Sequence, residues 1–141
     1  ENMLNIFAHQ PGPYATRFQG GTPPVPSCYA AGAGLGVILE IGTDAIGARV
    51  REVTRYALER LRHEGIAVST PNDDRVRGPM IAVKAFDDEK LVRRLIAERI
   101  VTSSRDGNVR AGFHFYNNRA DADHFVDALL RNGDLIERIA C

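Results

Sequence analysis

This chain of 141 residues has few cysteines, no net charge and no long apolar run. Its two cysteines, Cys28 and Cys141, lie far apart and outside any Cys-x-x-Cys spacing. The sequence therefore predicts neither a disulfide framework nor a zinc site, and it favours a reducing, cytoplasmic location. The longest apolar run, residues 30–39, is diluted by glycine and is far shorter than the ~20 residues that span a bilayer. No basic segment precedes it, so the sequence shows no signal peptide.

The balance of charge limits the possible partners. The 18 lysines and arginines equal the 18 aspartates and glutamates, so the formal net charge is zero. Nucleic-acid-binding domains and polybasic membrane-binding segments usually carry a basic surplus, and we expect neither kind of partner. With 44% hydrophobic and 26% charged residues, the chain is apolar enough and long enough to fold around a core.

Several catalytic and binding motifs are missing. No serine or cysteine occupies a nucleophile elbow, so covalent hydrolase chemistry has no support. Gly32, Gly34 and Gly36 follow no predicted strand and lack the Gly-x-Gly-x-x-Gly spacing of a dinucleotide loop. The four histidines lack the spacing of metal ligands, and we expect no metal site. These histidines are His9, His63, His114 and His124.

The chain begins with a loop-like arm and continues with two helices. Most of the prolines lie before residue 27, in a segment without a hydrophobic period. The small apolar residues 27–41 predict a helix that Gly42 ends. Thr43 is the expected N-cap of a second helix, in which apolar side chains recur every 3.6 residues until Gly65.

Beyond Gly65 the pattern changes to short strands and two further helices. Asp87 and Asn118 are expected to cap these helices, and the segment 105–108 has the residue types of a tight turn. The expected strands are residues 66–69, 80–85, 100–102 and 109–116. We therefore predict an α+β fold: a small, largely antiparallel sheet covered by helices on one face and preceded by an extended arm and two helices. The expected domains are an arm with the first helix (1–42), a small α+β domain (43–133) and a tail (134–141).

Two segments carry residues that suit an anionic ligand. The first is the turn of Gly20, Gly21 and Thr22, which lies just before a predicted helix start. Its backbone N–H groups, its hydroxyl and the positive end of the helix suit a phosphate or a carboxylate. The same residues also fit a simple capping loop.

The second segment is the strand that contains Arg110. A regular pleat would place one set of alternate residues, Arg110, Gly112, His114 and Tyr116, on one side of it. The other set is Ala111, Phe113 and Phe115. We expect this apolar side to face the core and the Arg110 side to face solvent or a cleft, where a guanidinium can bind a carboxylate through two hydrogen bonds.

The two segments resemble, in order and in local structure, two motifs of the class V aminotransferases. This fold-type I pyridoxal-phosphate family includes cysteine desulfurases, selenocysteine lyases, kynureninases and isopenicillin-N epimerase-like enzymes. Residues 17–23, Arg-Phe-Gln-Gly-Gly-Thr-Pro, resemble the family's RFExGTP segment, and residues 109–123 resemble its R-[IVA]-S-x-H-x-Y-N-T-x-x-D-[IVL] segment. The matching residues of the second motif are Arg110, His114, Tyr116, Asn117 and Asp121. The likeness covers most of the chain and implies the C-terminal part of such an enzyme.

The resemblance implies roles for individual residues. Thr22, with the amides near Gly21, would contact the phosphate of pyridoxal 5'-phosphate across a dimer interface. Arg110 would bind the α-carboxylate of an amino-acid substrate, and Arg105 would offer a contact to a second carboxylate or to a lid. The residues expected to hold the strand to the following helix are His114 and Asn117.

Two departures from the family pattern bear on activity. The lysine that binds the cofactor covalently lies in a large upstream domain of these enzymes, and neither Lys84 nor Lys90 fits that place. We therefore expect the small C-terminal domain without the cofactor-binding domain, inactive alone and without covalently bound cofactor. The segment 102–108 also lacks the cysteine of desulfurases, which leaves epimerases, carbon–sulfur lyases and aminotransferases.

Other origins stay open. The chain begins at Glu1, which fits a processed chain or a piece of a longer one. A free-standing α+β module that binds a ligand or a protein without chemistry is the competing hypothesis, and a proteolytic remnant is a third. Within an enzyme, residues 1–41 would pack on the missing domain and on a second subunit, so we expect a homo-oligomer or an exposed apolar helix.

Overall fold

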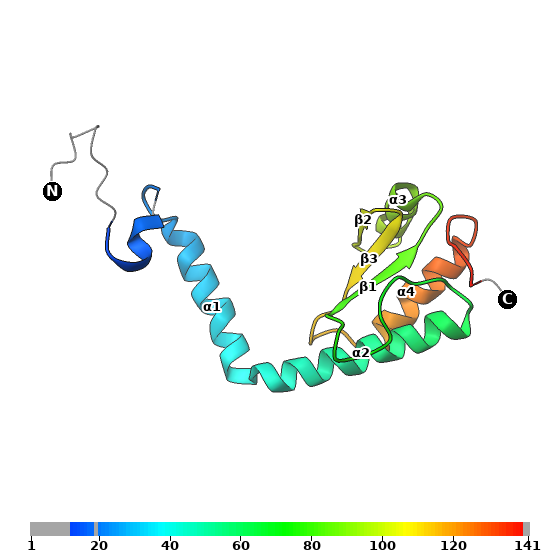
Figure 1. Ribbon diagram of the computed structural model, residues 1–141, viewed down its shortest axis with the longest axis horizontal. Helices are drawn as coiled ribbons and strands as arrows, with labels where there is room; N and C mark the ends of the chain where they lie inside the picture. The colour runs from blue at the N-terminus through cyan, green and yellow to red at the C-terminus, as the bar shows by residue number, and fades with distance from the viewer. Residues whose placement is uncertain (1–11, 19, 140–141) are drawn as a thin grey trace. The chain divides into compact units, whose positions relative to one another are not determined.

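The computed structural model describes residues 12–18 and 20–139, which fall into two compact units. The first unit is Glu1–Glu40 and the second is Ile41–Cys141. Along the chain (Figure 1) the elements are η1 (Tyr14–Phe18), α1 (Val25–Ile41), α2 (Thr43–His63), β1 (Met80–Lys84), α3 (Asp88–Ala97), β2 (Ser103–Arg105), β3 (Asn108–Gly112) and α4 (Arg119–Arg131). Gln19 and residues 1–11 of the expected arm lie outside the described residues.

The first unit consists mainly of the helix α1. The helix begins at Val25, slightly before the expected start, and contains Gly32, Gly34 and Gly36, so these glycines form no nucleotide-binding loop. None of its side chains is buried within the described structure. Among the described helices, none alone is long and apolar enough to cross a membrane. Only α1 and α2 counted together, across the break between them, reach that length and composition.

The break between α1 and α2 lies at Gly42. Its φ of 87° is in the region that favours glycine, because a Cβ atom there would crowd the backbone. Gly42 occupies the N-cap position of α2, Thr43 is the first helical residue, and no side chain caps the helix. The prediction of Thr43 as N-cap is therefore wrong, since the backbone at the cap needs a positive φ that threonine disfavours.

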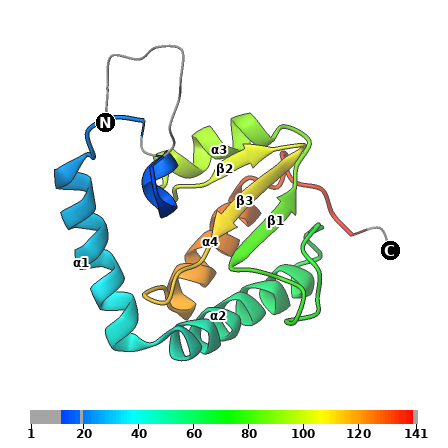
Figure 2. The ribbon, with the colours of Figure 1, turned by 60° about the vertical axis from the view of Figure 1, so that its left-hand side comes forward.

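The second unit contains a three-stranded antiparallel sheet in the order β1-β3-β2 (Figure 2). The central strand is β3, in which Arg110 pairs with Ala82 of β1 and with Ser103 of β2. Asp106 and Gly107 turn the chain between β2 and β3, and their φ values of 50° and 72° fit the type I′ hairpin that Asp-Gly favours. The predicted α+β fold with a small antiparallel sheet is confirmed.

The outer strands differ from the expected ranges. Residues 66–69 form only isolated bridges, from Ile66 to Arg138 and from Val68 to Val83. Residues 100–102 precede β2, because the N–H of Ile100 still bonds back to the carbonyl of Leu95 at 2.9 Å and so belongs to the end of α3.

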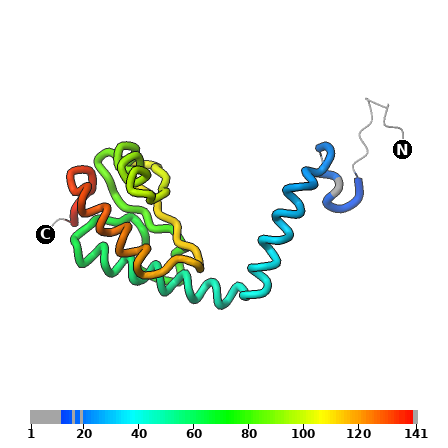
Figure 3. The backbone as a smooth tube through the Cα atoms, turned by 180° about the vertical axis from the view of Figure 1, so that it is seen from behind, coloured from blue at the N-terminus to red at the C-terminus, as the bar shows by residue number. Residues whose placement is uncertain are grey.

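One hydrophobic core lies on a single face of the sheet. Val83, Val109 and Ala111 point into it from the strands. The helices contribute Leu58, Leu61, Leu91, Leu95, Phe125 and Leu129. The helices α2 and α4 pack side by side along this face (Figures 2 and 3). Leu135 and Ile136, in the segment expected to be a tail, are buried in the same core.

Both predicted caps of the later helices are confirmed. At the start of α4, Asp121 N donates to Asn118 Oδ1 at 3.2 Å, and Asn118 N donates to Asp121 Oδ2 at 2.9 Å. The side chain of Asp87 accepts from Lys90 N in the same way at the start of α3. These bonds pair N–H groups that have no partner within the helix, and they fix where each helix begins.

We expect Asn118→Ala to lower the free energy of unfolding by about 1 kcal/mol, the usual cost of losing an N-cap side chain. Urea unfolding followed by circular dichroism measures the change. Asn72→Ala, in an exposed loop between α2 and β1, is the matched control and should have almost no effect. Equal losses in the two variants would contradict the capping role.

Candidate functional site

The sheet has a second face, which points away from the core and which we call the open face. Because successive strand residues point to opposite sides, burial of Val83 and Val109 places their neighbours on this face. Its residues are Met80, Ala82, Lys84, Ser103, Arg105, Asn108, Arg110 and Gly112. The charged strand residues of the open face are therefore all cationic, which favours an anionic ligand.

Arg110 lies in the middle of the open face and is half-buried. Its Nε donates to Ser103 Oγ at 3.3 Å, and none of the described residues forms an ion pair with it or bonds its two Nη groups. Its neighbours are small: Ala82 pairs with it, and a Cβ atom added at Gly112 would meet nothing within 4 Å. The guanidinium thus keeps a planar edge with N–H donors free for a carboxylate.

Two further cations share the open face with Arg110. Arg105, at the end of β2, is exposed, and its Nε lies 3.5 Å from the carboxylate of Asp106. Lys84 pairs with Asn108 across from Arg105 and is also exposed. Sequence reasoning weighed Lys84 only as a cofactor-binding lysine and missed its place beside Arg110. Side chains of Met80–Lys84 alternate between the core and the open face, and the antiparallel pairing of this strand with β3 then places Lys84 near Arg110.

The expected alignment of His114 and Tyr116 with Arg110 is wrong. The strand β3 ends at Gly112, and the residues that follow form a turn in which Asn117 N donates to His114 O at 3.0 Å. The rings of His114 and Tyr116 stack on one another with centroids 4.5 Å apart. Phe115, expected in the core, is only half-buried and lies against the His114 ring.

Asn117 connects this turn to α4 and α2 through hydrogen bonds. Its Oδ1 accepts from His114 N at 2.8 Å, and its Nδ2 donates to Asp121 Oδ2 of α4 at 3.2 Å. Its carbonyl accepts from Arg49 Nη2 of α2 at 3.1 Å. The expected role of Asn117 in holding the strand to the helix is confirmed, and His114 takes part through its backbone.

Glu52 holds Arg49 in place. The two side chains form an ion pair at 2.9 Å, and the hydrogen bond from Arg49 lowers the pKa of the Glu52 carboxyl below its usual value. Arg119, 3.5 Å from the other carboxylate oxygen, lowers this pKa further by a smaller amount. These contacts connect α2 to the turn that follows β3, the strand that contains Arg110.

The remaining site residues predicted from the sequence lie in the first unit. Gly21 and Thr22 are adjacent and exposed, a few residues before α1 begins at Val25. A Cβ atom added at Gly20 or Gly21 would meet nothing within 4 Å, so the backbone of this turn is open to a ligand. The structure thus brings Arg105 and Arg110 together on one face, and it places Gly21 and Thr22 together in the other unit.

The sequence of the second unit matches a known family. The model of the kynureninase C-terminal domain matches residues 46–129, which is more than half of the chain. This range contains Arg105 and Arg110, the open face and most of the core.

Individual relatives agree with this match. The chain is 26% identical to an uncharacterized aminotransferase, YcbU, of Bacillus subtilis, over 82% of the chain and 31% of the relative. It is 29% identical to a probable cysteine desulfurase of Staphylococcus aureus, over 81% of the chain and 31% of the relative. It therefore spans about a third of the length of these curated relatives.

One solved structure has the same fold. The apo structure of cysteine desulfurase from Thermococcus onnurineus NA1 superimposes with a TM-score of 0.76 over 84% of this chain and 33% of that one. At 20% sequence identity, this likeness shows the fold.

We expect Glu52→Gln to destabilise the protein at about pH 7 and to matter much less at about pH 3. A lowered pKa means that the folded state favours the carboxylate. Its stabilisation is therefore complete above the ordinary glutamate pKa of about 4.3 and is lost as the pH falls through the lower value of the folded state. Urea unfolding at both pH values measures the difference. The same substitution in an Arg49→Gln background should have a smaller effect, and a loss that does not change with pH would contradict the ion pair.

Proposed function

Because the chain belongs to the kynureninase C-terminal domain family, we propose that it is the C-terminal domain of a pyridoxal-phosphate enzyme that transforms an amino acid. The observation that carries this proposal is Arg110, a half-buried guanidinium without an internal ion pair among the described residues, in the middle of a cationic face. Its chemistry matches the carboxylate that every amino-acid substrate carries. The proposal rests on this match together with the family.

Arg110 binds the substrate's α-carboxylate in this proposal. A guanidinium donates two parallel hydrogen bonds to a carboxylate, which fixes the orientation of the attached Cα as well as its position. Orientation matters because the bond to be broken at Cα must be aligned with the cofactor's ring before reaction. The β3 register holds Arg110 on a rigid element, which keeps that orientation from one turnover to the next.

Arg105 and Lys84 extend the cationic face beside Arg110. Arg105 pairs with Asn108, two residues along β3 from Arg110, so the two guanidinium groups belong to neighbouring rows of one face. Arg105 offers a second contact to a carboxylate or to a segment that covers the substrate. Lys84 of β1 pairs with Asn108 on the edge of β3 opposite Arg105. It adds to the positive potential that attracts an anionic substrate.

The turn of Gly21 and Thr22 fits the phosphate of pyridoxal 5'-phosphate. Its open backbone N–H groups and its hydroxyl are the donors that a phosphate accepts. When bound, the cofactor supplies the electron-withdrawing ring on which the amino-acid chemistry depends. In this proposal the turn serves a neighbouring subunit, so the working protein is a homo-oligomer.

The covalent anchor of the cofactor comes from outside this chain. Lys84 lies on the open face of β1, and Lys90 lies in the first turn of α3, where its N–H bonds to Asp87. The chain spans about a third of its relatives, which fits a domain that supplies substrate recognition and a phosphate contact while the rest supplies the covalent anchor. Alone, the chain has no activity in this proposal.

The reaction class is narrowed by the segment 102–108, which carries no cysteine. This segment forms β2 and the turn into β3, directly before Arg110. A reaction that transfers sulfur to a cysteine thiol in this segment has no acceptor here, because no residue of the segment is a cysteine. We therefore favour a carbon–sulfur lyase, an epimerase or an aminotransferase.

In the full-length protein that contains this chain, Arg110→Ala should lower kcat/KM for its amino-acid substrate. The expected loss is about 2 to 5 kcal/mol of transition-state stabilisation, the scale for removing one partner of a hydrogen-bonded charge pair. Steady-state kinetics measure it. Arg93→Ala, an exposed arginine of α3 paired with Glu89, is the control and should leave kcat/KM unchanged. An unchanged kcat/KM in Arg110→Ala would refute the carboxylate role.

Thr22→Val should weaken retention of pyridoxal phosphate by the full-length protein. The substitution keeps the shape of the side chain and removes one hydrogen bond to a charged group, which stabilises by about 1.5 to 3 kcal/mol. Cofactor absorbance after dialysis measures the dissociation constant, which should rise at least about tenfold. Thr43→Val, at the exposed start of α2, is the matched control. Equal cofactor retention in Thr22→Val and in the unaltered protein would remove Thr22 from the phosphate site.

A further inference from the structure

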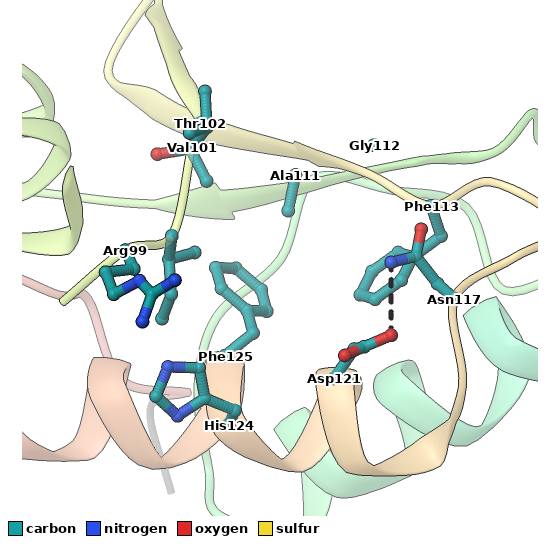
Figure 4. Close-up of a pocket in the computed structure, with 11 residues that line it drawn as sticks. Arg99, Val101, Thr102, Ala111, Gly112, Phe113, Asn117, Asp121, His124 and Phe125 are labelled. Atoms are coloured by element: carbon teal, nitrogen blue, oxygen red, sulfur yellow. Dashed lines mark hydrogen bonds between the residues drawn. The ribbon is translucent and has the colours of Figure 1, made fainter.

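A cavity of about 210 Å³ lies on the core side of the sheet, where the second unit is not fully closed (Figure 4). It is lined by the end of β3, by the segment 99–102 and by the first half of α4. Ala111 and Phe113 face it, whereas Arg110 points to the opposite side of the sheet. The Arg110 side chain is therefore not part of the cavity wall, and Gly112, at the end of β3, borders both the cavity and the open face.

The inner wall of the cavity is aromatic. Phe113 and Phe125 are buried and meet edge to face, with ring centroids 6.4 Å apart. Thr102 Oγ1 is buried and has no hydrogen-bond partner among the described residues. This oxygen has almost no accessible surface, so Thr102 borders the cavity through its other atoms.

Arg99 stands at one end of the cavity in an unfavourable backbone conformation. It follows the C-cap of α3 with a φ of 65°, a left-handed conformation that favours glycine. Its guanidinium forms no hydrogen bond or ion pair with the described residues. An arginine held in such a conformation beside a cavity suggests a role for its side chain.

The end of α2 has the same backbone turn as the end of α3, with Gly65 in the position that corresponds to Arg99. Gly65 has a φ of 67°, and Gly65 N donates to Arg62 O at 2.9 Å, as Arg99 N donates to Ile96 O at 2.9 Å. The following residues, Ile66 and Ile100, each donate to the carbonyl five residues before them at 2.9 Å. The backbone geometry of both ends thus suits glycine, and only the end beside the cavity carries an arginine.

The polar groups lie at two ends of the cavity, with Phe125 between them. Figure 4 shows Arg99 and His124 at one end and Asn117 with Asp121 at the other. Asp121 Oδ2 is engaged by Asn117 and by the cap of α4, and His124 Nε2 lies 3.3 Å from Glu98 O. The guanidinium of Arg99 is thus the cation left for a ligand, and the carboxylate of Asp121 keeps an anion away from the opposite end.

We propose that this cavity binds a small aromatic carboxylate, with its ring against Phe113 and Phe125 and its carboxylate on the guanidinium of Arg99. The ring packs against the parts of Phe113 and Phe125 that line the cavity, and the charged end pairs with the unpaired cation. This site needs no cofactor and is independent of the role proposed for Arg110.

Benzoate is the probe, added to the 141-residue chain and followed by amide NMR. Saturable shifts should appear at residues 99–102, at Phe113 and at the first half of α4, and benzylamine, with the opposite charge, should cause none. Arg99→Gly should weaken benzoate binding at least about tenfold, the loss expected for a charge-assisted hydrogen bond.

Arg99→Gly also separates binding from folding. Because glycine suits a positive φ, the variant should unfold at the same or a higher urea concentration than the unaltered chain. Arg93→Ala, on the exposed side of α3, is the control and should bind benzoate unchanged. The proposal is overturned if benzoate causes no saturable shifts around the cavity, or if Arg99→Gly binds it as tightly as the unaltered chain does.

Discussion

The central strand β3 is paired on both edges, and its register is the constraint on which the second unit depends. Val109 and Ala111 are buried between the two ladders, so Arg110 between them must point to the open face. A slip by one residue would expose these apolar side chains and push an unpaired guanidinium into the core, at a large desolvation cost. Burial of its neighbours, and not a bond to Arg110 itself, therefore sets the place of the guanidinium and leaves its Nη groups for a ligand.

Local patterns predicted much of this fold from the sequence. The apolar period of α2, the caps at Asp87 and Asn118 and the Asp106–Gly107 turn each depend on residues close together in the chain, and the structure has all of them. The alternation around Arg110 was also sufficient to place its side chain outside the core. In each of these features, the residues that form the stabilising interaction lie within a few positions of the residues that predict it.

Features that depend on distant contacts could not be predicted in the same way. The segment after Gly112 continues the alternating pattern, yet it turns, because Asn117 bonds to His114 and to Arg49 of a helix far away in sequence. Lys84 joins the open face only through the pairing of β1 with β3. The cavity beside Arg99 needs the segment 99–102, the end of β3 and α4 together, although the contrast between Glu-Gly-Ile at 64–66 and Glu-Arg-Ile at 98–100 is visible in the sequence.

In the proposed function, the second unit recognises the substrate and the turn before α1 binds the phosphate, and both roles depend on a larger protein. A structure of the full-length protein with pyridoxal phosphate and a bound amino acid tests this most directly. We expect the α-carboxylate to lie within hydrogen-bond distance of the Arg110 guanidinium. An amino acid whose carboxylate is held by other residues, with Arg110 left in solvent, would contradict it.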